Sequence, residues 1–212
     1  MSRGRLMVTN VIGIVVVLAL IIGGGYYYIQ QSNYVSTDNA KVSGDLYTIV
    51  APAAGKVKSV TTENGQDVSK DEEVATLQTE KGSTTVVAPE EGKIIKTEVK
   101  ENDSVQAGQK LASEVNMNKL YILANIDEDE LKDIEVGDDV DVTVDGDTET
   151  KIDGNVEEIG FAANSVFSLM PSSNNDGNYT KVSQTIPVKI SISNYSEDVL
   201  PGMNAEVKIS TN

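Results

Sequence analysis

The side chains that most often do chemistry at neutral pH are missing from this sequence of 212 residues. It contains no Cys and no His, which excludes cysteine nucleophiles, disulfide bonds, Cys/His zinc sites and the usual imidazole proton shuttle. The densest group of potential metal ligands is Asp127-Glu128-Asp129-Glu130. As a calcium loop it lacks the EF-hand spacing and the required glycine. We therefore predict no catalytic residue and no metal site, and we expect 127–134 to form a short solvated helix capped by Asp127.

The charge of the chain is strongly negative and unevenly distributed. The formal net charge is −16, yet no acidic residue precedes Asp38, and Arg3 and Arg5 stand near the start. A surface this acidic repels nucleic acid and anionic lipid headgroups. The sequence also has no Trp, which disfavours a stacking platform for bases. We predict that the protein has no nucleic-acid partner.

The N-terminal segment has the properties of a membrane anchor. The run from Val11 to Ile29 is uncharged and largely apolar, and at about 1.5 Å per residue it spans roughly 28 Å, close to the thickness of a bilayer core. The positive-inside rule places the N-terminus in the cytoplasm, and Tyr26, Tyr27 and Tyr28 suit the outer interface. A cleaved signal peptide is the alternative, although it favours a shorter apolar run. We predict a cytoplasmic tail at 1–10, a transmembrane helix at 11–30 and a main body outside the membrane.

An internal repeat organises the segment that follows. Residues 49–77 match residues 86–114, and each copy contains an Ala-Pro-x-x-Gly-Lys motif, at 51–56 and at 88–93. Each copy has β-branched residues in alternation, bounded by Pro and Gly, which indicates short strands and turns. Neither copy is long enough to bury its apolar face alone, so the two halves are expected to pack into one small sandwich.

This duplication resembles a biotinyl/lipoyl-type domain, which we place at 49–115. In carrier members of that superfamily a lysine at the hairpin between the halves bears the cofactor. Lys81 falls at this place, but its neighbours Glu80 and Gly82 depart from the carrier motif. The predicted topology also puts the hairpin outside the cell, away from the cytosolic ligases. We therefore predict a solvated turn lysine and no cofactor, with a lipoyl or biotinyl carrier as the competing interpretation.

Residues 116–212 contain alternating strands and tight turns, which predict a small antiparallel β-barrel. Residues 31–48 are expected to supply a membrane-proximal linker and a first barrel strand that pairs near the C-terminal one. A separate membrane-proximal piece at 34–48 is the alternative. The strand at 151–159 is expected to break at Asp153-Gly154. The fold class is therefore mainly β: an N-terminal transmembrane helix, a lipoyl-like sandwich of two repeated halves, and a barrel.

A long loop at 160–179 interrupts the predicted barrel, and loops of this length are often functional. Phe167, Leu169 and Met170 are the candidate contact residues of this loop, because apolar groups in a loop need a partner. The alternative is that these side chains tuck under the barrel as a plug.

The order of these features resembles the membrane fusion, or HlyD-type adaptor, family, and within it the EmrA-type branch. The most specific stretches are Ser165-Val166-Phe167-Ser168-Leu169-Met170-Pro171, Gly177-Asn178-Tyr179-Thr180-Lys181-Val182-Ser183-Gln184-Thr185-Ile186-Pro187-Val188-Lys189-Ile190 and Leu200-Pro201-Gly202-Met203. The resemblance implies a non-enzymatic, homo-oligomeric adaptor that extends an inner-membrane transporter for multidrug or amphipathic-compound efflux. It implies a major-facilitator pump as the partner, and it makes Phe167, Leu169 and Met170 the candidate contacts with substrate or transporter. An ABC-type exporter of peptides or lipids is the alternative, and a cell-wall spacer is a further one.

The chain departs from this family in one respect. Only about nine residues separate Leu77 from Val87, where members from two-membrane bacteria insert a long α-helical hairpin that meets an outer channel. A turn of this length leaves no room for a coiled coil. We therefore predict a single-pass protein of the cell membrane in a Gram-positive-type bacterium, with no outer-membrane channel as partner.

Overall fold

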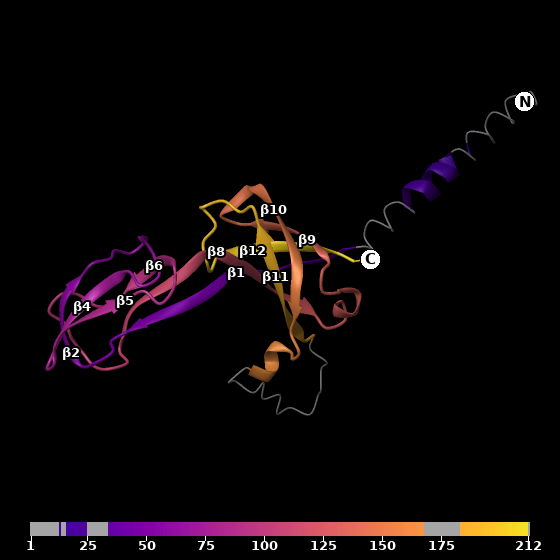
Figure 1. Cartoon of the computed structure of the whole chain (residues 1–212). Helices are drawn as coiled ribbons and strands as arrows, with labels where there is room; N and C mark the ends of the chain where they lie inside the picture. Colours follow the sequence, from indigo (N-terminus) through magenta and orange to yellow (C-terminus); the bar gives the residue numbers. More distant parts are fainter. Residues whose placement is uncertain (1–12, 14–15, 25–33, 168–182, 212) are drawn as a thin grey trace, which may run out of the picture.

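The structure is a computed structural model that describes residues 13, 16–24, 34–167 and 183–211. Two β bodies, a barrel and a smaller sandwich, are joined by two long strands (Figure 1). The strands and short helices, in chain order, are β1 (Tyr34–Val50), β2 (Gly55–Val60), β3 (Asp67–Val68), β4 (Glu73–Thr79), β5 (Gly82–Val87), β6 (Gly92–Thr97), β7 (Ser104–Val105), β8 (Lys110–Asp127), η1 (Leu131–Asp133), β9 (Asp139–Val144), β10 (Asp147–Ile159), η2 (Asn164–Phe167), β11 (Thr185–Ser193) and β12 (Asn204–Ser210).

The described part of the N-terminal segment is helical. Residues 16–24 form a helix with exposed apolar side chains, including Ile22 at 70% exposure. Among the residues that the structure describes, no helix is both long enough and apolar enough to cross a membrane. Val11, Ile29 and the tyrosines at 26–28 lie outside the described residues, so the membrane anchor stays a prediction.

The barrel is a closed ring of six antiparallel strands, in the order β1-β12-β9-β10-β11-β8, and pairing of β1 with β8 closes it. The first strand, β1, lies beside the last strand, with Val35 opposite Ile209. Closure removes exposed sheet edges. Period-two alternation sends one face of each strand inward, and the resulting core includes Val42, Ile122, Ala124, Ile126, Val140, Val142, Val144, Ile152, Val188, Ile190, Val207 and Ile209.

One predicted strand break is absent from the barrel. Strand β10 runs through Asp153-Gly154, because Gly154 pairs with Val140 of β9 on one side and Ile192 of β11 on the other. These two ladders hold the backbone extended where the sequence suggested a turn. The expected break at this position is therefore wrong.

The sandwich is built from the two repeated halves, which exchange strands. In the first half β2 pairs with β4, and in the second half β6 pairs with β8. The short strands cross over, since β7 pairs with β2 and β3 pairs with β6. The shared core contains Val57, Leu77, Ile94 and Leu111, each at most 1% exposed. Neither half could close this core alone.

The glycine of each repeat motif is explained by a close backbone approach. A Cβ atom on Gly55 would lie 2.6 Å from the carbonyl oxygen of Gln78, and one on Gly92 would lie 2.5 Å from the carbonyl oxygen of Val115. Contacts this short are not tolerated, so both positions require glycine. The motif therefore marks where each half packs against its own partner strand.

The acidic segment after β8 differs from the expected capped helix. It contains a single 3₁₀ turn, η1, whose N-cap residue is Glu130 and has no side-chain cap. Asp127 is the last residue of β8, and its backbone carbonyl, rather than its carboxylate, accepts from the Glu130 amide at 3.0 Å. Ile134 is buried, at 5% exposure. Pairing of Asp127 with Thr185 of β11 extends the strand through the position predicted to be a cap.

Candidate functional site

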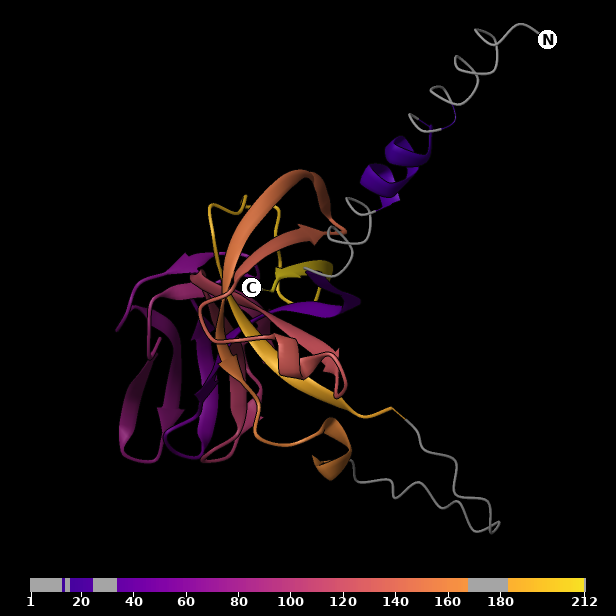
Figure 2. The ribbon, with the colours of Figure 1, turned by 90° about the vertical axis from the view of Figure 1, so that its right-hand side faces the viewer.

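The two ends of the barrel carry different elements, and the direction of the strands decides which elements lie at each end. Strands β1, β9 and β11 begin at one end, and β8, β10 and β12 finish there. This proximal end therefore carries Tyr34, η1, η2 and the end of β12. The opposite end, the junction end, leads through β1 and β8 into the sandwich. In Figure 1 the sandwich and the helix at 16–24 lie on opposite sides of the barrel, and in Figure 2 the sandwich lies partly behind the barrel.

The loop that contains η2 is fixed to the proximal end by polar contacts. The side-chain amide of Asn164 donates to Asn125 Oδ1 at 2.7 Å and to Thr185 Oγ1 at 3.0 Å. Asn125 in turn donates to Asn39 Oδ1 at 3.0 Å. The Gly160 amide donates to the carbonyl of Pro187, which lies on β11, at 2.8 Å. These bonds join β1, β8, η2 and β11, so they set the direction in which the loop leaves the barrel.

Large apolar residues are exposed beside this anchoring network. Phe161 is 98% exposed and Val166 is 69% exposed. Of the predicted contact residues, Phe167 closes η2, and Leu169 and Met170 lie outside the described residues. The prediction that singled out 167, 169 and 170 missed Phe161. The signal for it was an aromatic directly after Gly160, at the point where the strand pattern stops.

An acidic recess of about 510 Å³ opens at the proximal end next to this network. Burial, followed by repulsion from Asp127, Asp129 and Asp133, raises the pKa of Glu130 above its ordinary value. Among the described residues no group of three or more acidic side chains is placed to hold a metal ion. The acidic residues that line the recess are Asp38, Asp127, Glu130 and Glu206.

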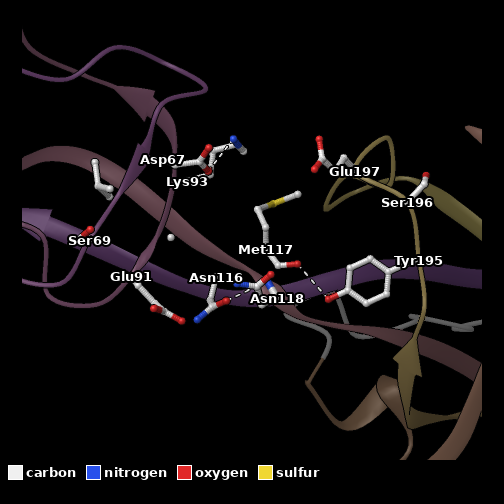
Figure 3. Close-up of a pocket in the computed structure, with 12 residues that line it drawn as sticks. Asp67, Ser69, Glu91, Lys93, Asn116, Met117, Asn118, Tyr195, Ser196 and Glu197 are labelled. Carbon is white, nitrogen blue, oxygen red and sulfur yellow. Dashed lines mark hydrogen bonds and ion pairs between the residues drawn. The ribbon is translucent and has the colours of Figure 1, made fainter.

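The junction end contains an irregularity that tyrosine stabilises. Between the pairs Gly44–Leu120 and Leu46–Val115, β1 has one residue and β8 has residues 116–119, so β8 bulges. The hydroxyl of Tyr195 donates to the Met117 carbonyl at 2.9 Å and accepts from the Leu120 amide at 3.3 Å. Figure 3 shows this contact at the edge of a cleft of about 530 Å³ between barrel and sandwich. Sequence reasoning did not single out Tyr195.

A second hollow at the junction is apolar. It has a volume of about 760 Å³ and lies between β1, β6, β8 and the turn that contains Leu200. Single exposed apolar residues carried no signal in the sequence, because they are normal on a protein surface. The residues that line this junction groove are Lys41, Val42, Ser43, Gly44, Leu46, Gly65, Lys93, Ile94, Ile95, Lys96, Ser113, Val115, Met117, Leu123, Leu200, Pro201 and Gly202.

The hairpin that would carry a cofactor in a lipoyl protein is a tight turn here. Thr79 of β4 pairs with Gly82 of β5, which leaves Glu80 and Lys81 at the tip. Lys81 is exposed, and its amide donates to Thr79 Oγ1 at 3.3 Å. The same pairing shows that β4 and β5 are joined directly, without an α-helical hairpin.

Comparisons with known proteins agree with this architecture. The family description "YhbJ, barrel-sandwich hybrid domain" matches residues 45–116. The chain is 56% identical over 210 residues to "Putative efflux system component YhbJ" of Bacillus subtilis (strain 168), which covers 99% of this chain and 95% of that protein. It is 32% identical over 134 residues to "Colistin resistance protein EmrA" of Acinetobacter baumannii, which covers 62% of this chain but 38% of that protein.

A solved structure also shares the fold. The periplasmic adaptor protein EmrA aligns with a TM-score of 0.59 at 16% identity, over 85% of this chain and 99% of that one. The barrel, the sandwich of repeated halves and the long match to YhbJ establish the relationship. The chain belongs to the family of HlyD- and EmrA-type membrane fusion proteins.

Proposed function

We propose that the protein is a non-enzymatic adaptor subunit of an efflux system for multidrug or amphipathic compounds. It would extend the extracellular side of an inner-membrane transporter of the major-facilitator type. The names of two relatives support an export role, since one is an efflux system component and the other a colistin resistance protein. The observation that carries the proposal is the composition of the proximal end, where the chain enters the barrel and an exposed apolar loop leaves it.

The anchor that we propose at 11–30 would hold this end at the membrane. Because β1 begins at Tyr34 on the proximal end, a short connection places the barrel next to the bilayer. The sandwich then points away from it. The N-terminus would be cytoplasmic and the main body extracellular, in a single-pass arrangement.

The η2 loop would be the part that meets the transporter. Phe161 and Val166 are exposed apolar groups at the proximal end, and they belong to the same loop as the predicted contacts Phe167, Leu169 and Met170. Exposed apolar patches of this kind mark interaction sites. The polar network around Asn164 would hold the start of the loop while its tip engages the partner.

At the opposite end the sandwich would pack in a homo-oligomer around an export path. The turn at Glu80-Lys81 connects β4 and β5 directly, so this part of the chain offers no long arm for an outer-membrane channel. We propose that the protein works without such a channel.

Co-purification from native membranes tests the proposal. The full chain carries a C-terminal affinity tag, and the complex is cross-linked, isolated and analysed by mass spectrometry. A major-facilitator transporter in the complex is the expected result. An ATPase as the partner would instead favour adaptation of an ABC-type exporter, and the absence of any transporter would contradict the proposal.

A further inference from the structure

The junction groove combines apolar side chains that are far apart in the sequence. Leu46 comes from β1, Ile95 from β6, Leu123 from β8, and Leu200 from the turn before β12. Their exposed fractions are 65%, 44%, 40% and 46% respectively. Each of these is unremarkable alone, but together they line one hollow of about 760 Å³. That size lies within the range of small-molecule sites in proteins, roughly 300–1,000 Å³.

The charge around the groove is opposite to that of the protein as a whole. The chain has a formal net charge of −16, yet among the residues that the structure describes no Asp or Glu lines the groove, whereas Lys41, Lys93 and Lys96 do. The acidic recess at the proximal end shows the reverse pattern, with four carboxylates. The groove is therefore a local positive site on an acidic protein.

The three lysines are not equally committed to other partners. Lys93 pairs with Asp67 at 2.7 Å and donates to the Gly65 carbonyl, and Lys96 pairs with Glu98 at 3.0 Å. Lys41 forms no ion pair within the described residues. It lies on β1 directly opposite Leu123, so an ammonium group without a counter-ion stands beside exposed aliphatic carbon.

We propose that the junction groove binds an amphipathic organic anion. Its apolar body would lie against Leu46, Ile95, Leu123 and Leu200, and its carboxylate or similar head would face Lys41. Burying the aliphatic surface supplies affinity, and the unpaired lysine supplies selectivity for charge. The identification of the ligand as a transported compound rests on the proposed export function. Binding in the groove does not depend on export.

Two matched fluorescent probes test the groove directly. The full chain is placed in lipid nanodiscs and titrated with dansyl-labelled undecanoate, and then with the same probe bearing trimethylammonium in place of the carboxylate. Empty nanodiscs provide the reference for partition into lipid. The anionic probe is expected to bind the protein about tenfold more tightly than the cationic one. Equal affinities, or a preference for the cation, would overturn the proposal.

Paired variants locate the binding. Lys41→Glu is expected to lower the affinity for the anionic probe about fivefold or more without lowering the affinity for the cationic probe. Leu46→Ser is expected to lower the affinity for both probes roughly tenfold, because both lose the same aliphatic contact. The matched controls are Lys58→Glu, at an exposed lysine of β2, and Val136→Ser, at a residue 64% exposed. Both controls lie outside the groove and should bind as the unmodified protein does.

Other outcomes separate this inference from the proposed function. If the unmodified chain binds neither probe and Leu46→Ser converts an oligomer into a monomer, a second copy covers the groove and the inference is wrong. If the variants no longer bind the anionic probe but export in cells is unchanged, the groove is a binding site that has no role in export. If export depends on the protein but not on these residues, and the probes do not bind, the proposed function survives without the groove.

Discussion

A buried carboxylate in the sandwich makes the sharpest prediction about stability. Glu114 of β8 is 0% exposed. Its Oε1 accepts from the Glu90 amide at 3.1 Å, whereas its Oε2 has no hydrogen-bond partner among the described residues. Burial raises the pKa of Glu114 above its ordinary value of 4.5, the charge of Glu90 adds to this, and the hydrogen bond from the backbone opposes it. In the other half of the repeat the equivalent position is Leu77, also 0% exposed.

The change Glu114→Gln should therefore stabilise the protein at neutral pH. Glutamine keeps an oxygen for the Glu90 amide and removes the buried charge. Its NH2 group takes the place of the unpaired Oε2, which offsets part of this effect, so we expect a net gain of about 1 kcal/mol. For a chain of this size each kcal/mol raises the melting temperature by about 2–4 °C.

The gain should depend on pH with a definite sign. Because the pKa of Glu114 is higher in the folded chain, the folded protein keeps its proton over a range in which the unfolded chain has lost it. Stability of the unmodified protein therefore falls as the pH rises from about 4.5 through the folded pKa. Glutamine does not titrate, so the difference in stability should be larger at pH 7 than well below pH 4.5, where the glutamate is protonated in both the folded and the unfolded chain.

Thermal unfolding followed by circular dichroism between pH 4 and pH 8 measures this difference. The matched control is Glu101→Gln, the same chemical change at an exposed position, which should shift the melting temperature by less than about 2 °C. A Glu114→Gln protein that melts lower than the unmodified one at pH 7, or whose gain is the same at pH 4, would refute the reasoning.

Three further predictions concern single substitutions. Gly92→Ala should destabilise the sandwich by about 2–4 kcal/mol, because the new Cβ would lie 2.5 Å from the Val115 carbonyl oxygen. Denaturant unfolding measures the loss of stability, and a loss below about 1 kcal/mol would show that the two strands move apart easily. Tyr195→Phe should lower the free energy of unfolding by about 1–2 kcal/mol, since the Met117 carbonyl loses its donor. The rate of amide hydrogen exchange at the β8 bulge should rise, and an unchanged rate would contradict the role given to the hydroxyl. Phe161→Asp should leave the melting temperature unchanged, because this side chain is 98% exposed, and it should reduce export in cells. A lower melting temperature would show instead that the loop packs on the barrel.

Much of the fold was predictable because each part has a local pattern. The motif around Gly55 returns around Gly92, and the two positions meet the same steric requirement in the structure. The alternating strands predicted for 116–212 form the barrel, and Val140, Val142 and Val144 of β9 lie in its core with the spacing of two that a strand requires. The expectation of a mainly β chain with a sandwich and a barrel is confirmed, and its N-terminal transmembrane helix stays a prediction.

The two local errors have a common physical cause. Asp153-Gly154 and Asp127 carry turn and cap signals, but neighbouring strands on the barrel pair with both positions and keep the backbone extended. Pairing across the sheet outweighed local propensity in each case. This information lies in the neighbouring strands and not in the segment itself.

The sites were harder to predict than the fold, since they depend on residues brought together by closure. The groove joins Leu46, Ile95 and Leu200, which are separate exposed residues in the sequence. The glutamate at 114 was visible as a mismatch with Leu77 in the repeat, but its hydrogen bond from the Glu90 amide, which belongs to a different turn, was not. Phe167 was predicted from its loop and stays a prediction, whereas Tyr195 acts through contacts with a bulge that the sequence did not indicate.

Export by living cells tests the central claim most directly. Cells that lack the chain, and cells in which the full chain is restored, are loaded with an anionic and a cationic fluorescent amphipath, and the rate of efflux is measured. The account predicts slower efflux of at least the anionic compound without the chain, and recovery when it is restored. Efflux of both compounds that is unchanged by removal of the chain would contradict the account.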